Sequence, residues 1–168
     1  MTDAILDLLN SIFGASYFAR CLITFLISML PIVELRGAIP IGVGILGLPI
    51  HTAAIISLIG NMVPAPFIII FIRKIFGWMR KKSRRLGAFA DRFEKKAKSK
   101  GEKLYRRELI GLMIFVAIPL PGTGAWTGSL IAALLDIRLK TALPAIAAGV
   151  LIAAILVTGI TYGFTALF

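Results

Sequence analysis

The sequence is poor in cysteine and in acidic side chains, and both shortages exclude classes of protein. Cys21 is the only cysteine among 168 residues, which rules out a disulfide framework and a zinc ribbon. The first residues lack the basic region of a secretory signal peptide, because Asp3 and Asp7 come before the first basic residue, Arg20. The sequence contains neither a Gly-rich phosphate loop nor a His-Glu-x-x-His motif, and its single His and Cys do not form a hydrolase centre. We therefore expect no enzyme, no metal site and no cofactor.

Apolar residues dominate the composition of the sequence. They make up 58% of the chain, and the mean hydropathy is +0.92, well above the level of a soluble domain. The net charge of +11 fits basic cytoplasmic loops of a membrane protein better than a nucleic-acid interface, because no recognition module accompanies it. The length predicts a single membrane domain over residues 1–168, in contact with membrane lipids and with no nucleic-acid partner.

Two segments are long enough to cross a bilayer, and two others are interrupted. A helix needs about 20 apolar residues to span roughly 30 Å of hydrocarbon, and residues 52–72 and 141–163 meet this length. The apolar stretches 21–50 and 109–136 are broken by prolines, glycines and charges, which leaves pieces of about 12 residues, or roughly 18 Å. Non-helical backbone at membrane depth is tolerated only inside protein or beside a wet cavity. Each interrupted stretch is therefore predicted to form a re-entrant hairpin.

The two halves of the chain follow the same order. In each half a proline precedes the break, and a short apolar helix and a long helix follow, with Thr52 and Gly60 spaced like Thr141 and Gly149. A hairpin plus one crossing moves the chain to the other side, so the sequence predicts an all-α inverted repeat, as in secondary transporters. We expect an N-terminal interfacial helix over residues 1–19 and the first repeat over residues 20–72. A cytoplasmic basic amphipathic linker helix should follow over residues 73–108, and the second repeat over residues 109–168.

The distribution of basic residues predicts the topology. Of the 19 basic residues, 15 lie between Arg73 and Arg107, and Arg138 and Lys140 follow the second hairpin. The positive-inside rule makes this side cytoplasmic and both termini external, in a multi-pass protein of the inner membrane. The alternative, in which each interrupted stretch crosses once, would export Arg138 and Lys140. Two full spans cover the hairpins only thinly, which favours a homodimer.

Glu34 and Arg36 are the only ionisable residues at a predicted mid-membrane break. Charged groups at this depth are costly and are therefore candidates for function. Pro31, Gly37 and Pro40 favour an extended backbone, in which the two side chains point the same way. Burial favours the neutral form of the Glu34 carboxyl and Arg36 favours its ionised form, so Glu34 could carry a proton. A purely structural ion pair is the alternative.

The second break offers polar groups without charge. The candidate binding residues of the first break are Glu34, Arg36, Gly37 and Pro40. Those of the second break are Pro119, Pro121, Gly122, Thr123, Gly124, Trp126 and Thr127. The second helix of each hairpin should begin near Ala38 and near Gly124, with its partly positive N-terminus at the membrane centre, which favours an anion. Arg36 can hold a phosphate or carboxylate through two parallel hydrogen bonds. Capping by Thr123 and packing of Trp126 are the structural alternative.

Two runs resemble a known family, namely Glu34-Leu35-Arg36-Gly37-Ala38-Ile39-Pro40 and Pro119-Leu120-Pro121-Gly122-Thr123-Gly124-Ala125-Trp126-Thr127-Gly128. Over about residues 20–164 the chain resembles the putative small multidrug export protein family, distant relatives of the DedA and SNARE-associated membrane proteins. The resemblance implies hairpins that meet head to head and the movement of polyprenyl-phosphate carriers or phospholipids, often driven by protons. The DedA proteins carry an arginine in the second hairpin, whereas here Arg36 lies in the first.

These features together predict a small secondary transporter, coupled to protons, with a site formed by the two hairpin tips. The expected substrate is amphipathic, and an anionic lipid or polyprenyl-phosphate carrier is favoured over a lipophilic drug, because Arg36 and two helix N-termini outweigh one glutamate. Two alternatives remain: a lipid scramblase, and a membrane scaffold or assembly factor in which Glu34 and Arg36 have a structural role.

Overall fold

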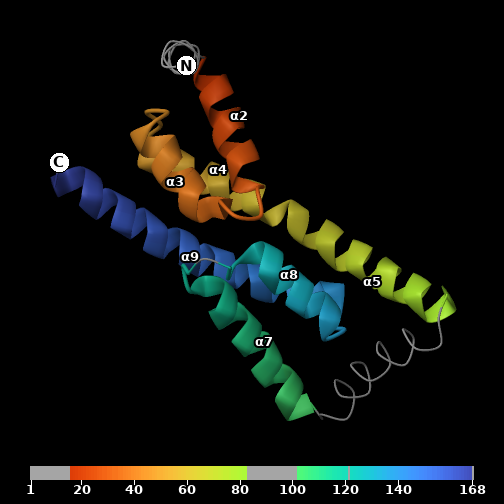
Figure 1. The fold of residues 1–168 in the computed structure, drawn as a ribbon. Helices are drawn as coiled ribbons and strands as arrows, with labels where there is room; N and C mark the ends of the chain where they lie inside the picture. Colours follow the sequence, from red (N-terminus) through yellow and green to blue (C-terminus); the bar gives the residue numbers. More distant parts are fainter. Residues whose placement is uncertain (1–15, 83–101, 121, 168) are drawn as a thin grey trace. The chain divides into compact units, whose positions relative to one another are not determined.

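The computed structural model describes residues 16–82, 102–120 and 122–167, and within these ranges the chain forms helices and no strands. The predicted all-α class is therefore confirmed for this part of the chain. Residues 1–15 of the predicted N-terminal helix, residues 83–101 of the predicted linker helix, and Pro121 lie outside the described residues. In chain order the helices are α2 (Tyr17–Ser28), α3 (Glu34–Gly44), α4 (Ile50–Met62), α5 (Pro64–Lys82), α7 (Glu102–Ala117), α8 (Ala125–Leu134) and α9 (Leu139–Leu167) (Figure 1).

Two of the helical segments have the length and composition needed to cross a membrane. They are Ile50–Ile75 and Leu139–Phe164, with mean hydropathies of 2.3 and 2.4. The predicted spans lie within them, so both long apolar helices are confirmed. The first segment bends at Val63, where α4 ends and α5 begins at Pro64. Proline suits a first helical position, since it cannot donate a hydrogen bond to the preceding turn.

The chain forms two compact units, each built around one pair of short helices. Unit 1 consists of Met1–Asn61 and Ala154–Phe168, and unit 2 of Met62–Ala153. In unit 1, α2 packs against α3; in unit 2, α8 packs against both α7 and α5. The predicted interruptions of the two apolar stretches are confirmed, because α2 and α3 are separate helices, as are α7 and α8.

The start of α2 lies close to the end of α3 in unit 1. Near the start of α2, Tyr17 donates a hydrogen bond to Thr52 Oγ1 on α4 at 3.2 Å. One turn later, Arg20 Nη1 donates to the carbonyl oxygen of Leu46, just after α3, also at 3.2 Å. Leu46 is buried in an apolar cluster against which the half-buried Cys21 packs. These contacts hold the start of α2 close to the loop that follows α3.

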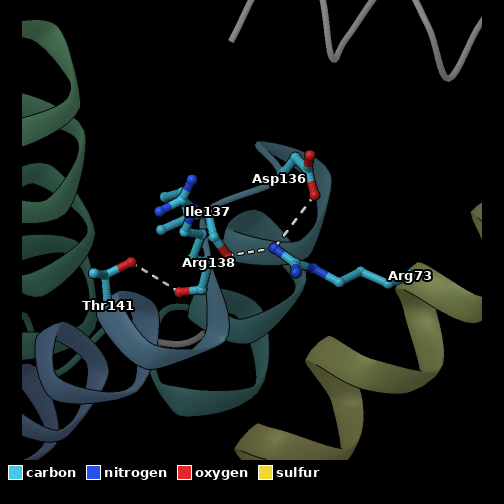
Figure 2. A network of polar contacts seen from close by, with 5 residues as sticks. All are labelled: Arg73, Asp136, Ile137, Arg138 and Thr141. Carbon is cyan, nitrogen blue, oxygen red and sulfur yellow. Dashed lines mark hydrogen bonds and ion pairs between the residues drawn. The ribbon is translucent and has the colours of Figure 1, made fainter. Parts of the chain in front are cut away.

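A second arginine holds the corresponding loop in unit 2, as Figure 2 shows. Arg73, on α5, donates from Nη2 to the carbonyl oxygen of Ile137, between α8 and α9, and the same nitrogen lies 3.3 Å from Asp136 Oδ1. This contact holds α5 beside the loop between α8 and α9. Thr141 contributes a further hydrogen bond to the Arg138 carbonyl at 2.8 Å, in the first turn of α9.

Two glycines mark close helix crossings, one in each unit. A Cβ atom on Gly60 would lie 2.1 Å from Ser28 Oγ and 2.7 Å from the Phe25 carbonyl oxygen, on α2. A Cβ atom on Gly149 would lie 2.6 Å from the Met113 carbonyl oxygen, on α7. Helix α4 therefore contacts α2, and α9 contacts α7, at backbone distance, as small residues permit in membrane bundles.

Candidate functional site

The first break is shorter than the sequence predicts, and α3 begins at Glu34 rather than near Ala38. The prediction of an extended backbone through Glu34 and Arg36 is therefore wrong. Both residues lie in the first turn of α3, where positions two apart point to different sides. Glu34 is buried, with 3% of its surface exposed, whereas Arg36 is only half-buried. Pro40 lies inside α3 and is exposed.

Glu34 has an unusual backbone conformation. Its φ is +50°, in the left-handed region that non-glycine residues avoid at a cost of about 1–2 kcal/mol. The Glu34 N–H donates to the Leu30 carbonyl at 3.0 Å, which holds the turn between α2 and α3. Its carboxylate interacts electrostatically with Arg36. Because strained residues of this kind concentrate at functional sites, Glu34 is the strongest functional candidate of the first break.

Gly37 is required by the packing of the same turn. Its N–H donates to the Val33 carbonyl at 3.0 Å. A Cβ atom on Gly37 would lie 2.4 Å from Val33 Cγ1, a distance that side chains do not tolerate. The glycine therefore lets Val33 fold onto the start of α3, and its role in the structure is to shape the turn that carries Glu34 and Arg36.

Both breaks expose large apolar side chains. At the first break these are Leu30 and Ile32, the latter with 94% of its surface exposed, and at the second they are Ile118 and Leu120. Such residues are unfavourable at a loop tip in water but suit contact with lipid or with an apolar ligand.

The second break is held by Thr123 and shaped by glycines. The Thr123 hydroxyl lies 2.7 Å from the Ile118 carbonyl oxygen and 2.8 Å from that of Leu120, and donates to one of them at a time. Gly122 and Gly124 have φ values of +83° and +129°, which glycine adopts without strain. The hydroxyl of Thr123 is thus engaged by the loop backbone and does not cap α8.

Helix α8 begins directly after Gly124, as predicted. Its first turn carries Trp126 and Thr127, both half-buried, so the structure brings these two candidates together with Gly124. Pro119 lies at the other end of the loop and is half-buried. No side chain caps the start of α8 or of α3 through a hydrogen bond.

Sequence reasoning missed the roles of Arg20 and Arg73, each of which donates to the backbone after the second hairpin helix of its unit. The burial of Ser57 and Asn61, two polar residues of α4, was likewise not predicted. An acidic residue just after a short apolar helix, Asp136, is a signal in the sequence from which a partner for Arg73 could have been inferred.

Comparison with known proteins gives a family. A family model described as putative small multi-drug export protein matches residues 34–156, well over half of the chain. The match begins at Glu34, the first residue of α3, and it includes the second break, α4, α5, α7, α8 and most of α9. Comparison with curated proteins and with solved structures gives no match. The distant relationship to the DedA proteins stays a prediction. With its two long apolar helices and this match, the chain belongs to the putative small multi-drug export protein family of membrane proteins.

Proposed function

We propose that this protein is a proton-coupled secondary transporter of the inner membrane, which moves an amphipathic substrate past the first break. In this proposal Glu34 carries the proton and Arg36 binds an anionic head group. The observation that carries the proposal is the carboxyl group of Glu34, buried and held in a strained backbone conformation where a half-length helix begins. Burial of a carboxyl group and a left-handed backbone each lower stability, and this supports a functional role for Glu34 over a purely structural one.

A re-entrant course of both hairpins is part of the proposal. The contacts Tyr17–Thr52 and Arg20–Leu46 support it in unit 1, because they join the entry and exit of the hairpin. In unit 2 the Arg73–Ile137 contact supports it, because the cytoplasmic end of the first span then lies level with the exit of the second hairpin. At 12 and 10 residues, α2 and α8 are about 18 and 15 Å long, too short to cross about 30 Å.

The inverted repeat is the second structural part of the proposal. The matching glycine crossings support it, since Gly60 and Gly149 occupy the same place after Thr52 and Thr141 and each contacts the first helix of its own hairpin. The parallel between Arg20 and Arg73 adds to this support. One full span between the hairpins gives them opposite orientations, with the basic residues 73–107 on the cytoplasmic side.

The chemistry of the first break fits an anionic amphipath. Arg36 is half-buried, so its guanidinium can offer parallel donors to a phosphate or carboxylate without full desolvation. The exposed side chains of Leu30 and Ile32 offer an apolar surface on the same turn. When Glu34 is protonated, Arg36 loses its competing negative neighbour and binds an anion more tightly. Proton uptake and anion binding are then linked, which is the requirement for coupling.

Transport in proteoliposomes tests this function. The probes are a fluorescent short-chain phosphatidylglycerol and, for the drug alternative, the lipophilic cation ethidium, each with and without a pH gradient. We expect gradient-dependent movement of the lipid, loss of this movement in Glu34→Gln, and weaker lipid transport in Arg36→Ala. Glu108→Gln is the matched control, because Glu108 is a half-buried acidic residue of α7 outside both breaks.

The outcomes separate the alternatives. Lipid movement that needs no gradient and survives Glu34→Gln identifies a scramblase. No movement of either probe, with all variants folded, contradicts transport of these amphipaths and leaves the scaffold. Movement of ethidium alone would reverse the proposed substrate charge and assign Glu34 to cation binding.

A further inference from the structure

The last two turns of α4 carry polar groups that are buried but not hydrogen-bonded. Asn61 has 1% of its surface exposed and Ser57 has none, and the two are one helical turn apart on the same face. Among the residues that the structure describes, neither amide atom of Asn61 nor the hydroxyl of Ser57 has a hydrogen-bond partner. Buried polar groups in proteins normally have a hydrogen-bond partner, so these two side chains are candidates for binding an ion or a small polar ligand.

Several other buried hydroxyls have partners, so the shortage is not general, although Thr158 Oγ1 on α9 shares it. In the same unit, Thr24 Oγ1 donates to the Arg20 carbonyl at 2.9 Å, and Ser28 Oγ donates to the Phe25 carbonyl at 2.7 Å. In unit 2, the equally buried Ser129 donates to the Ala125 carbonyl at 2.6 Å. Hydroxyls inside these units therefore often bond to the preceding helical turn, whereas those of Ser57 and Thr158 do not.

The bend after α4 adds a third oxygen. In a regular helix the Gly60 carbonyl accepts a hydrogen bond from the N–H of residue 64, but Pro64 has no N–H. Besides Asn61 Oδ1 and Ser57 Oγ, the end of α4 thus has a Gly60 carbonyl that lacks its regular helical donor.

The electrostatics of this helix end favour a positive charge. The C-terminus of a helix carries a partial negative charge, and no basic side chain lies in the last turn of α4. Broken helices of membrane transporters bind cations through such carbonyl ends. In the described part of the chain no group of three His, Cys, Asp or Glu side chains is placed to hold a metal, which disfavours zinc or calcium at this position.

We propose that the end of α4 binds a monovalent cation, of which sodium is the probe, through Asn61 Oδ1, Ser57 Oγ and the Gly60 carbonyl. Because an amide oxygen and nitrogen exchange places on a 180° rotation, Asn61 can turn its oxygen to the ion. The site goes beyond the proposed transport function and does not depend on it, since binding needs no substrate.

Thermal unfolding of the purified full-length protein in detergent tests the site. The unfolding temperature is measured in sodium chloride and in choline chloride at equal ionic strength, without substrate. We expect it to rise with sodium until the site is saturated, because an ion that binds only the folded state stabilises it. Choline, which is too large for the site, should give no rise. Potassium serves as a second alkali ion, and a response to it alongside sodium supports the site with weak selectivity.

Three variants identify the ligands. Asn61→Leu removes both amide atoms at similar volume and should abolish the sodium response. Ser57→Ala should weaken it, so that more sodium is needed for half of the rise. Ser129→Ala, which removes an equally buried but hydrogen-bonded hydroxyl, is the matched control and should respond like the unmodified protein.

The proposal is overturned if the unmodified protein unfolds at the same temperature in sodium and choline, or if Asn61→Leu keeps the full response. Should Asn61→Leu fail to fold, Asn61→Asp decides the question, because a carboxylate at this position should lower the sodium concentration needed. Unchanged sodium dependence in Asn61→Asp also overturns the site. A positive result here together with failed lipid transport contradicts the proposed function alone.

Discussion

Replacing Gly149 by alanine tests the close crossing of α9 and α7. The added Cβ would lie 2.6 Å from the Met113 carbonyl oxygen, whereas ordinary contacts begin at 3.4 Å, so the two helices must separate by the difference, about 0.8 Å. Overpacking of this kind costs about 1–3 kcal/mol. Alanine also favours a helix over glycine by about 1 kcal/mol, and this gain partly hides the clash.

Gly159→Ala is the control that removes this ambiguity. Gly159 lies in the same helix, α9, and a Cβ atom on it would meet nothing within 4 Å. Because the gain in helix propensity is common to both variants, their difference isolates the crossing. Unfolding in detergent, followed by tryptophan fluorescence, should show Gly149→Ala less stable than Gly159→Ala by about 1–3 kcal/mol. Equal stabilities would refute the crossing, and with it one support for the repeat.

Three further predictions follow from single contacts. Arg73→Leu should lower stability by about 1–3 kcal/mol, because the buried carbonyl of Ile137 loses its donor. Asp136→Asn should cost less than about 1 kcal/mol, since the ion pair with Arg73 is partly exposed. Heat unfolding at low and high salt separates the contribution of the hydrogen bond from that of the ion pair. Thr123→Val should speed amide hydrogen exchange in the second break, and Thr123→Ser should not. In a cysteine-free background, single cysteines at positions 52 and 140 should react with impermeant reagents from opposite sides, and reaction from one side contradicts the inverted repeat.

Prolines made the interruptions of the apolar stretches predictable. Helix α2 ends shortly before Pro31 and α7 shortly before Pro119, as expected from the restricted backbone around proline. The start of α3 was not predictable in this way. Pro40 removes one helical hydrogen bond, yet α3 continues through it because the helix places Leu35 and Ile39 together in the buried interior. Tertiary burial therefore outweighed the local signal.

Contacts between distant residues could not be predicted from pattern. Arg73 and Ile137 are 64 residues apart, and a backbone carbonyl leaves no mark in a sequence. The burial of Asn61 was hidden for another reason. In a membrane helix both the lipid-facing and the protein-facing sides are apolar, so periodicity does not reveal which side lies inside the protein. The residues of the first break were accessible because charge is rare at that depth.

Under the proposed function, in which Glu34 carries the proton, its left-handed conformation sets stability and activity against each other at one position. Glycine there would relieve the backbone strain, and selection for a more heat-resistant protein should favour it. The same exchange removes the acid group, so the most durable variant at this position should be among the least active. A library randomised at position 34 and sorted once for thermal resistance and once for transport should therefore return different amino acids.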